Sequence, residues 1–373
     1  MNNVLTPLSP TYDPWEALYS IKEYGQHTLT SVEMTVTNLC NMRCEHCAVG
    51  DTLVIKEPPK IPLDLMFKRL DEVKHLKTIS ITGGEPTFAK NNVEDYIVPL
   101  LKYARNRGIR SQINSNLTLP YERYKEIVKY LDVMHISFNY LNAHDFHQVG
   151  FAKSGHTVPF QAAERLYNTM VENTKRMAAE TDVLVSAESM INFRTHEKIV
   201  DIHNLIIEMG CLRHEVHPMY PSSFAKDLPV ISKEQMRLAI NKLLDHRHQD
   251  IWMLFGTLPF YHCSNDVEER KLLTRLANEK NVTVRNDPDG RNRVNVNLFT
   301  GDVFVTDFAD ISSFGNVLNQ DLDSIFNEWL QGELAQSVNC HCPIVNCCGP
   351  NLLVKDMYYK DENFLLKKAI LDK

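Results

Sequence analysis

The chain has 373 residues, enough for one large domain and a smaller one, and its 43% hydrophobic and 23% charged residues are typical of a globular protein. A net charge of −7 argues against a broad phosphate-binding face, so we expect no nucleic acid partner. There is no signal peptide and no apolar run of the roughly 18 residues that span a bilayer, which favours a cytoplasmic protein without a membrane partner.

Strand-like and helix-like segments alternate from residue 32 to about residue 220. Short β-branched runs predict strands, and apolar residues spaced three and four apart predict amphipathic helices between them. Six such units in series predict a parallel sheet, and six strands are too few to close an eight-stranded barrel. The expected fold is α/β, a partial (β/α)6 TIM-like barrel with its site at the carboxyl ends of the strands. The predicted strands are residues 32–37, 78–82, 112–115, 133–138, 183–190 and 214–219, and the predicted helices are residues 63–73, 93–107, 121–131, 160–177 and 196–209.

Beyond residue 220 the pattern changes. We predict connecting helices at residues 232–248 and 265–280, a β-rich stretch at 281–305 and a further helix at 321–334. A smaller cysteine-rich extension ends the chain. The predicted division is an N-terminal lead-in (1–31), the partial barrel (32–225), a helical connector (226–262) and the cysteine-rich region (263–373).

Three of the nine cysteines form a C-x3-C-x2-C motif directly after the first predicted strand, at Cys40, Cys44 and Cys47. Clustered thiols in a cytoplasmic protein indicate metal binding in preference to disulfides. Three thiolates can hold three corners of a [4Fe–4S] cluster and leave one iron open for another ligand, since such clusters usually take four cysteines. The alternative is a structural zinc site with His46 as the fourth ligand.

This motif resembles the signature of the radical S-adenosylmethionine (SAM) superfamily. The resemblance implies that the open iron chelates SAM and that an external donor such as flavodoxin or ferredoxin reduces the cluster. SAM is then cleaved to methionine and a 5′-deoxyadenosyl radical, which takes a hydrogen atom from the substrate. It also implies that His46, where relatives usually have an aromatic residue, contacts adenine.

Residues after later strands match other SAM-binding elements of that superfamily. The Gly-Gly-Glu-Pro turn after the second strand resembles the element that binds the methionine amino group, and polar residues at later strand ends resemble contacts to the ribose and carboxylate. Helix capping or turn formation is the alternative for each of these polar residues, and His217 could equally be a satisfied residue of the barrel rim. The predicted SAM contacts are His46, Gly83, Gly84, Glu85, Pro86, Asn114, Ser137 and Asn192.

The C-terminal cysteines form a C-x-C-x4-C motif that begins at Cys340. With the preceding turns and helix, this order resembles the SPASM/twitch extensions of radical SAM enzymes, and the whole chain resembles the YfkAB-type radical SAM/CxCxxxxC-motif proteins. The resemblance implies one auxiliary [4Fe–4S] cluster, with a zinc site on the same thiolates as the alternative. Its predicted ligands are Cys263, Cys340, Cys342 and Cys347, with Cys348 as a substitute for Cys347.

Asp307 occupies the place of an aspartate that accepts a proton in sulfatase-maturating relatives. It is a candidate general base, or else a solvated turn residue. The expected activity is hydrogen abstraction from a peptide or protein side chain. A radical SAM enzyme acting on a small metabolite and a non-catalytic zinc protein remain as alternatives.

Overall fold

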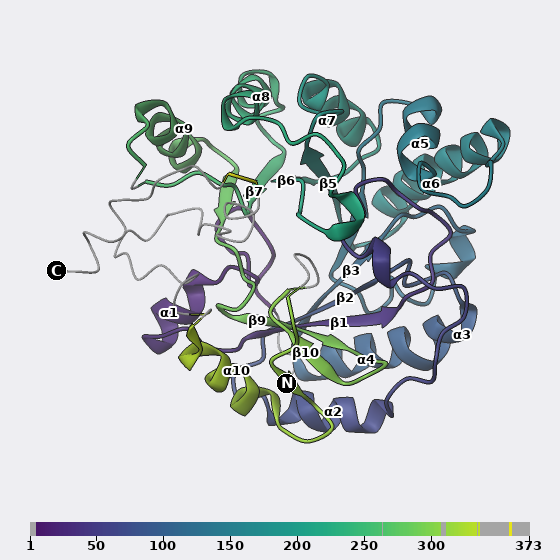
Figure 1. Ribbon diagram of the computed structural model, residues 1–373, viewed down its shortest axis with the longest axis vertical. Helices are drawn as coiled ribbons and strands as arrows, with labels where there is room; N and C mark the ends of the chain where they lie inside the picture. Colours follow the sequence, from purple (N-terminus) through teal and green to yellow (C-terminus); the bar gives the residue numbers. More distant parts are fainter. Residues whose placement is uncertain (1–4, 263, 307–310, 334, 336–357, 360–373) are drawn as a thin grey trace.

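A computed structural model describes residues 5–262, 264–306, 311–333, 335, 358 and 359. Within these residues one sheet of eleven strands has the order β11-β10-β9-β1-β2-β3-β4-β5-β6-β7-β8. Neighbouring strands from β9 through β1 to β8 are parallel, and β10 and β11 add antiparallel strands at one edge. The sheet curves, and helices lie around its outside (Figure 1).

All six predicted strands are present, and the α/β partial barrel is confirmed. Each strand begins and ends within two residues of its predicted bounds, because the β-branched and apolar runs that mark a strand end at polar or glycine-containing turns. The strands are β1 (Ser31–Thr37), β2 (Thr78–Gly83), β3 (Arg110–Ser115), β4 (Val133–Ser137), β5 (Leu184–Ile191) and β6 (Arg213–Pro218).

The parallel sheet continues beyond the six predicted strands. Strand β7 (Trp252–Gly256) lies inside the segment predicted as a helical connector, and β8 (Val282–Arg285) follows it in the same direction. All five residues of β7 are buried, so this strand has no polar–apolar alternation for a sequence pattern to detect. The predicted connecting helices are crossover helices of further βα units, α8 (Lys233–His246) and α9 (Val267–Asn278). The remaining strands are β9 (Arg293–Asn297), β10 (Asp302–Phe304) and β11 (Gly315–Asn316).

Most predicted helices are also present, with one exception. Residues 121–131 begin with a 3-10 helix (Tyr121–Arg123) and continue as turns, because their backbone bonds alternate between three- and four-residue spacings. A π-helix (Val93–Ile97) precedes α4, and α1 and α5 were not predicted. The helices not yet given bounds are α1 (Leu18–Tyr24), α2 (Leu63–Glu72), α3 (Lys90–Asn92), α4 (Val98–Arg107), α5 (Ala143–Gly150), α6 (Phe160–Glu180), α7 (Ile199–Glu208) and α10 (Leu322–Gln331).

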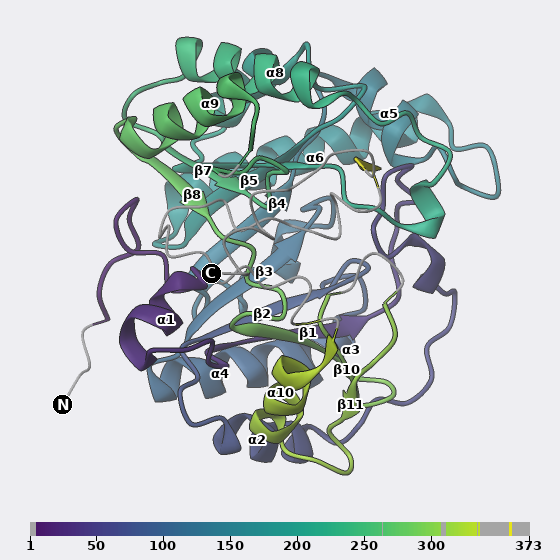
Figure 2. The same cartoon turned by 60° about the vertical axis from the view of Figure 1, so that its left-hand side comes forward.

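Alternate residues of the strands face opposite sides of the sheet. In β1, Val32, Met34 and Val36 belong to a large hydrophobic core, whereas Glu33 and Thr35 bond to the side chain of Asn295 on β9. Helices α2 and α10 lie side by side on the outside (Figure 2). A second core joins β6 and β7 to α8 and α9. Within the described part of the chain, no helix is long and apolar enough to cross a membrane.

Candidate active site

The C-x3-C-x2-C loop lies at the carboxyl end of β1, where the parallel sheet of an α/β barrel carries its functional loops. Backbone bonds tie it to the end of α5, from the Arg43 amide to the Gly150 carbonyl (2.9 Å) and from the Glu45 amide to the Val149 carbonyl (3.0 Å). The Arg43 guanidinium also donates to the Cys40 carbonyl at 3.0 Å. The loop is therefore held on both sides of Cys44.

Cys40, Cys44 and Cys47 are half-buried thiols, and they are close enough to influence one another electrostatically. Burial raises the pKa of Cys40 to about 12 and that of Cys44 well above its ordinary value. Two thiols that resist ionisation without a bound metal suit a site where a metal stabilises the thiolates. Among the described residues, no three His, Cys, Asp or Glu side chains are arranged as they would be around a single metal ion.

The Gly-Gly-Glu-Pro turn after β2 lies directly against this loop. The Gly84 amide donates to the Thr37 carbonyl (2.8 Å), and the Glu85 amide donates to the Leu39 carbonyl (2.7 Å). A Cβ at Gly83 would stand 2.1 Å from the Thr37 oxygen, and Gly83 has a φ of 134°. These glycines therefore allow close contact between two backbone segments, as well as the predicted approach of a ligand.

Glu85 is buried, with 1% of its surface exposed. Its carboxylate accepts from the Thr87 hydroxyl (2.5 Å), the Ser115 hydroxyl (2.9 Å) and the Asn116 amide (2.7 Å). Burial raises the pKa of the carboxyl against the lowering effect of these bonds. The side chain therefore joins the β2 turn to the end of β3, and the SAM contact of Glu85 stays a prediction.

The other predicted SAM contacts lie at carboxyl ends of neighbouring strands. Asn114 and Ser137 are half-buried near the ends of β3 and β4. Asn192, after β5, is buried and accepts from the Arg194 amide at 2.9 Å, so its side chain stabilises a turn as the structural alternative expected. The SAM contacts of these residues stay predictions.

A charged network that sequence reasoning did not predict lies inside the barrel. Glu188 on β5 bonds to His135 Nε2 at 2.9 Å and forms an ion pair with His217. Burial opposes ionisation, but the two imidazoles hold the pKa of Glu188 well below its ordinary value. The only sequence signal was the recurrence of ionisable residues at alternate positions of apolar strands.

The sequence left the role of His217 undecided. In the structure, His217 is a partner of Glu188. Burial alone would lower the pKa of His217, yet the charge of Glu188 raises it. The imidazole also donates to the Pro218 carbonyl (2.6 Å) and stacks on Tyr220, with ring centres 4.5 Å apart. Burial and the nearby His217 lower the pKa of His46 to about 4, so the network reaches the cysteine loop.

Several predicted residues lie outside the described residues, namely Cys263, Asp307, Cys340, Cys342, Cys347 and Cys348. Their metal-binding and catalytic roles stay predictions. Cys211, which was assigned no role, is buried in the core that packs outside the sheet.

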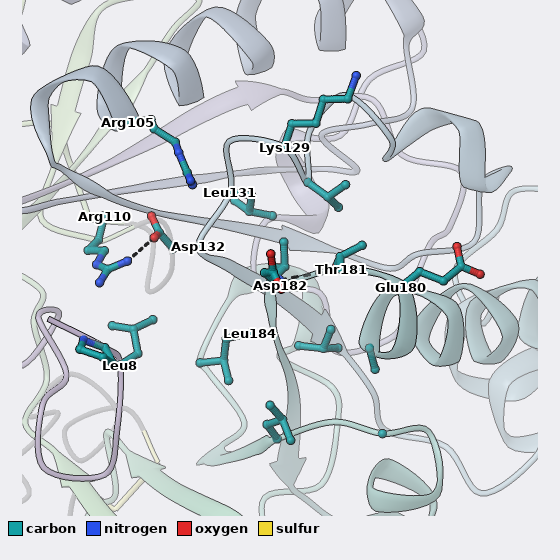
Figure 3. Close-up of a pocket in the computed structure, with 17 residues that line it drawn as sticks. Leu8, Arg105, Arg110, Lys129, Leu131, Asp132, Glu180, Thr181, Asp182 and Leu184 are labelled. Carbon is teal, nitrogen blue, oxygen red and sulfur yellow. Dashed lines mark hydrogen bonds and ion pairs between the residues drawn. The ribbon is translucent and has the colours of Figure 1, made fainter. Parts of the chain in front are cut away.

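A cavity of about 740 Å³ lies at the amino ends of β3, β4 and β5. Figure 3 shows Arg110 and Asp132, which form an ion pair in its wall, together with Leu184. The cysteine loop follows a carboxyl end, so this cavity belongs to the opposite end of the barrel. None of the predicted site residues that the structure describes lines it.

Two known protein families match separate segments of the chain. Residues 34–178 match the radical SAM superfamily, and residues 219–369 match the YfkB-like domain. The fold also resembles that of Streptococcus suis SuiB bound to S-adenosylmethionine, with a TM-score of 0.61, 14% identity, and coverage of 91% of this chain and 77% of SuiB. The chain therefore belongs to the radical SAM superfamily, and it is an enzyme.

Within that superfamily the chain is 53% identical to the YfkA protein of Bacillus subtilis (strain 168) over 369 residues, which cover 99% of each chain. It belongs to the same family as YfkA. A protein of Saccharolobus islandicus (strain Y.N.15.51 / Yellowstone #2) with the name "Probable GTP 3′,8-cyclase" is 22% identical over 239 residues, covering 61% of this chain and 71% of that protein. The structure of anSMEcpe with AdoMet and the Cp18Cys peptide has a TM-score of 0.58 at 14% identity, covering 92% of this chain and 95% of anSMEcpe.

Proposed function

We propose that this enzyme binds a [4Fe–4S] cluster on Cys40, Cys44 and Cys47 and binds SAM beside it at the carboxyl ends of the strands. The observation that carries the proposal is the packing of the cysteine loop on the Gly83–Gly84 turn. When bound and reduced, the cluster supplies the electron that cleaves SAM to methionine and the 5′-deoxyadenosyl radical, which abstracts hydrogen from the substrate.

The residues around the loop fit this pair of ligands. Three cysteines leave one iron of a cubane without a protein ligand. The His46 ring is buried beside Cys47, and its Nδ1 has no hydrogen-bond partner. This fits a ring that contacts the adenine of SAM when SAM is bound. Ser137 and Asn114 present polar groups at the next strand ends. The barrel wall limits the access of water to the reacting atoms.

The test is anaerobic purification followed by iron, sulfide and zinc analysis and a 5′-deoxyadenosine assay with dithionite and SAM. We expect iron and sulfide in the wild type and 5′-deoxyadenosine after reduction. The Cys44→Ala variant should lose both, and the Cys211→Ala variant should keep both because Cys211 lies in the core. Stoichiometric zinc without iron, or no 5′-deoxyadenosine from fully loaded protein, would reject the proposal.

A second proposal concerns an auxiliary [4Fe–4S] cluster on Cys263, Cys340, Cys342 and Cys347, with Cys348 able to replace Cys347. Four thiolates are the usual ligand set of such a cluster. The two clusters together predict about eight iron atoms per chain. A Cys340→Ala/Cys342→Ala variant should keep about four and still form 5′-deoxyadenosine, whereas unchanged iron content would reject these ligands.

For the substrate we propose a peptide or protein side chain. The support is the likeness to SuiB, whose structure contains the precursor peptide SuiA, and to anSMEcpe with its Cp18Cys peptide. The GTP 3′,8-cyclase relative favours a small metabolite as the second candidate. We assign electron delivery to an external flavodoxin or ferredoxin, and substrate deprotonation to Asp307. Incubation with peptides encoded beside the gene, followed by mass spectrometry, separates the two substrate classes.

A further inference from the structure

The inner face of the barrel is polar where the interior of a closed TIM barrel is packed with branched apolar residues. Register places His135, Ser186 and Arg213 side by side on β4, β5 and β6, facing the same side of the sheet. Glu188 and Glu215 are likewise paired on β5 and β6. A layer of this composition cannot form a hydrophobic core, so the inner face is built to surround polar groups.

Several buried polar atoms on this face have no hydrogen-bond partner. They include Nη1 and Nη2 of Arg213, Nη2 of Arg285, Nδ1 of His135 and Oε1 of Gln112. Buried polar atoms in folded proteins are nearly always paired, so each such atom requires an explanation. The four residues come from β8, β6, β4 and β3. Their unpaired atoms are mostly N–H donors, which favours an acceptor-rich ligand.

The two arginines converge on one carboxylate. Arg285 Nη1 lies 3.1 Å from Glu215 Oε1, and Arg213 Nη2 lies 3.9 Å from Glu215 Oε2. Arg213 Nε donates to the Ser186 hydroxyl at 2.8 Å, and Arg285 Nε donates to Asp13 at 2.7 Å. Both guanidinium groups are thereby fixed in orientation, and the remaining N–H groups are left for a further acceptor.

We propose that Arg213 and Arg285 form a subsite for an oxyanion of the substrate, a carboxylate or a phosphate, inside the barrel. The proposal rests on the proposed function and adds a chemical requirement to the unknown substrate. Arg213 is the first residue of β6, and Arg285 is the last residue of β8. The oxyanion is assigned to the substrate because none of the predicted SAM contacts lies on β6 or β8. Planar guanidinium groups suit either acceptor, because their paired N–H donors match carboxylate and phosphate oxygens.

The experiment measures thermal unfolding of the full-length, cluster-loaded protein without SAM, under anaerobic conditions. Sodium phosphate and sodium succinate are titrated in separate arms, with sodium chloride keeping the ionic strength constant. A ligand that binds the folded state raises the unfolding temperature with its concentration. We expect a saturable rise with at least one anion, and the stronger arm distinguishes a phosphate from a carboxylate substrate.

Arg213→Lys keeps the positive charge but loses the paired N–H donors of the guanidinium group, and Arg213→Met loses both. Each should weaken the apparent affinity about tenfold or more, since hydrogen bonds to charged groups contribute about 1.5–3 kcal/mol. The matched control is Arg247→Met, because Arg247 is also buried with unpaired N–H groups but lies after α8 and bonds to Glu279. This variant should respond to the anions like the wild type.

No saturable response in the wild type would mean that water alone satisfies these donors and would overturn the subsite. An equal response in Arg213→Lys and the wild type would also overturn it. These outcomes are independent of the proposed function, which fails instead when the wild type forms no 5′-deoxyadenosine.

Discussion

Gly83 is the residue at which the site depends most directly on the absence of a side chain. Its φ of 134° is unfavourable for other residues, and a Cβ would lie 2.1 Å from the Thr37 oxygen. The Gly83→Ala variant should therefore lose about 2 kcal/mol or more of unfolding free energy, since strain and a backbone clash act together. It should also bind less iron. Urea unfolding and iron analysis of the anaerobic protein measure both effects.

Gly155 provides the matched control for this substitution. It has no atom within 4 Å of a built Cβ and an ordinary φ. Gly155→Ala should therefore leave stability and iron content unchanged. Equal stability of the two variants would show that the turn after β2 can move away from the cysteine loop without loss.

A second prediction at the residue scale concerns Glu188 and His217. Glu188→Gln removes the charge that raises the pKa of His217, so burial should then lower that pKa. In the wild type, the raised pKa contributes stability that is fully present below pH 6.5 and is lost as the pH rises through the folded value. The variant should lack this contribution. NMR titration of the metal-free protein measures the pKa, and urea unfolding between pH 6 and pH 9 measures the stability.

Glu197→Gln serves as the control, because the Glu197 side chain is 85% exposed and lies beside His196. It should leave the titration of His217 unchanged. An unaltered His217 pKa in Glu188→Gln would mean that another group provides the charge.

At the scale of elements, strands could be predicted from the sequence wherever the residues of the strand itself and of its flanking turns mark its bounds. The β1 segment is β-branched and ends at a polar loop, so its bounds and the place of Cys40 follow from the sequence. The segment 121–131 has the apolar spacing of a helix, and its Tyr124, Ile127 and Leu131 are indeed buried. Its backbone nevertheless forms turns, because spacing determines which residues are buried but not which hydrogen bonds form.

Other features depend on contacts between distant segments and could not be predicted from local patterns. Strand β7 is apolar throughout, so its direction and neighbours are defined only by β6 and β8. The network of His135, Glu188 and His217 joins three strands, and each residue alone resembles an ordinary polar side chain. Only the register of the sheet brings them together.

The packing of α7 on β6 yields a prediction of acid sensitivity. His203 on α7 and His214 on β6 are buried, with their Nδ1 atoms 3.0 Å apart. Burial, with smaller effects of His248 and Arg247, lowers the pKa of His203 to about 4, and burial lowers that of His214 well below its ordinary value. The unfolded chain binds these protons below pH 6.5 while the folded chain does not, so stability should fall as the pH falls from 6.5 towards 4.

The slope approaches about 1.4 kcal/mol per pH unit for each such histidine. His203→Gln should reduce this slope, and the exposed His156→Gln should not. Urea unfolding at several values between pH 7 and pH 5 measures the difference. An unchanged slope in His203→Gln would place the acid sensitivity elsewhere in the molecule.

At the scale of the whole molecule, the described sheet is open between β8 and β11, and its helices pack in two hydrophobic cores. The segment before α1 joins the two sides. Trp15 Nε1 donates to the Ser80 hydroxyl of β2 at 3.1 Å, and Asp13 pairs with Arg285 of β8 at 2.7 Å. The Pro10 carbonyl accepts from Thr283 of β8 at 2.9 Å. This segment therefore ties β2 to β8 across the sheet.

Trp15 is 1% exposed, and its replacement tests whether this connection makes the molecule unfold as one unit. Trp15→Ala should lose about 3–5 kcal/mol, since it removes a large buried ring and leaves a cavity. Because the segment contacts both β2 and β8, the two cores should then separate into two unfolding steps. Urea unfolding followed by circular dichroism and by tryptophan fluorescence detects that separation. The half-exposed Phe88→Ala should keep one coincident transition, and coincident transitions in Trp15→Ala would show that the sheet alone couples the two cores.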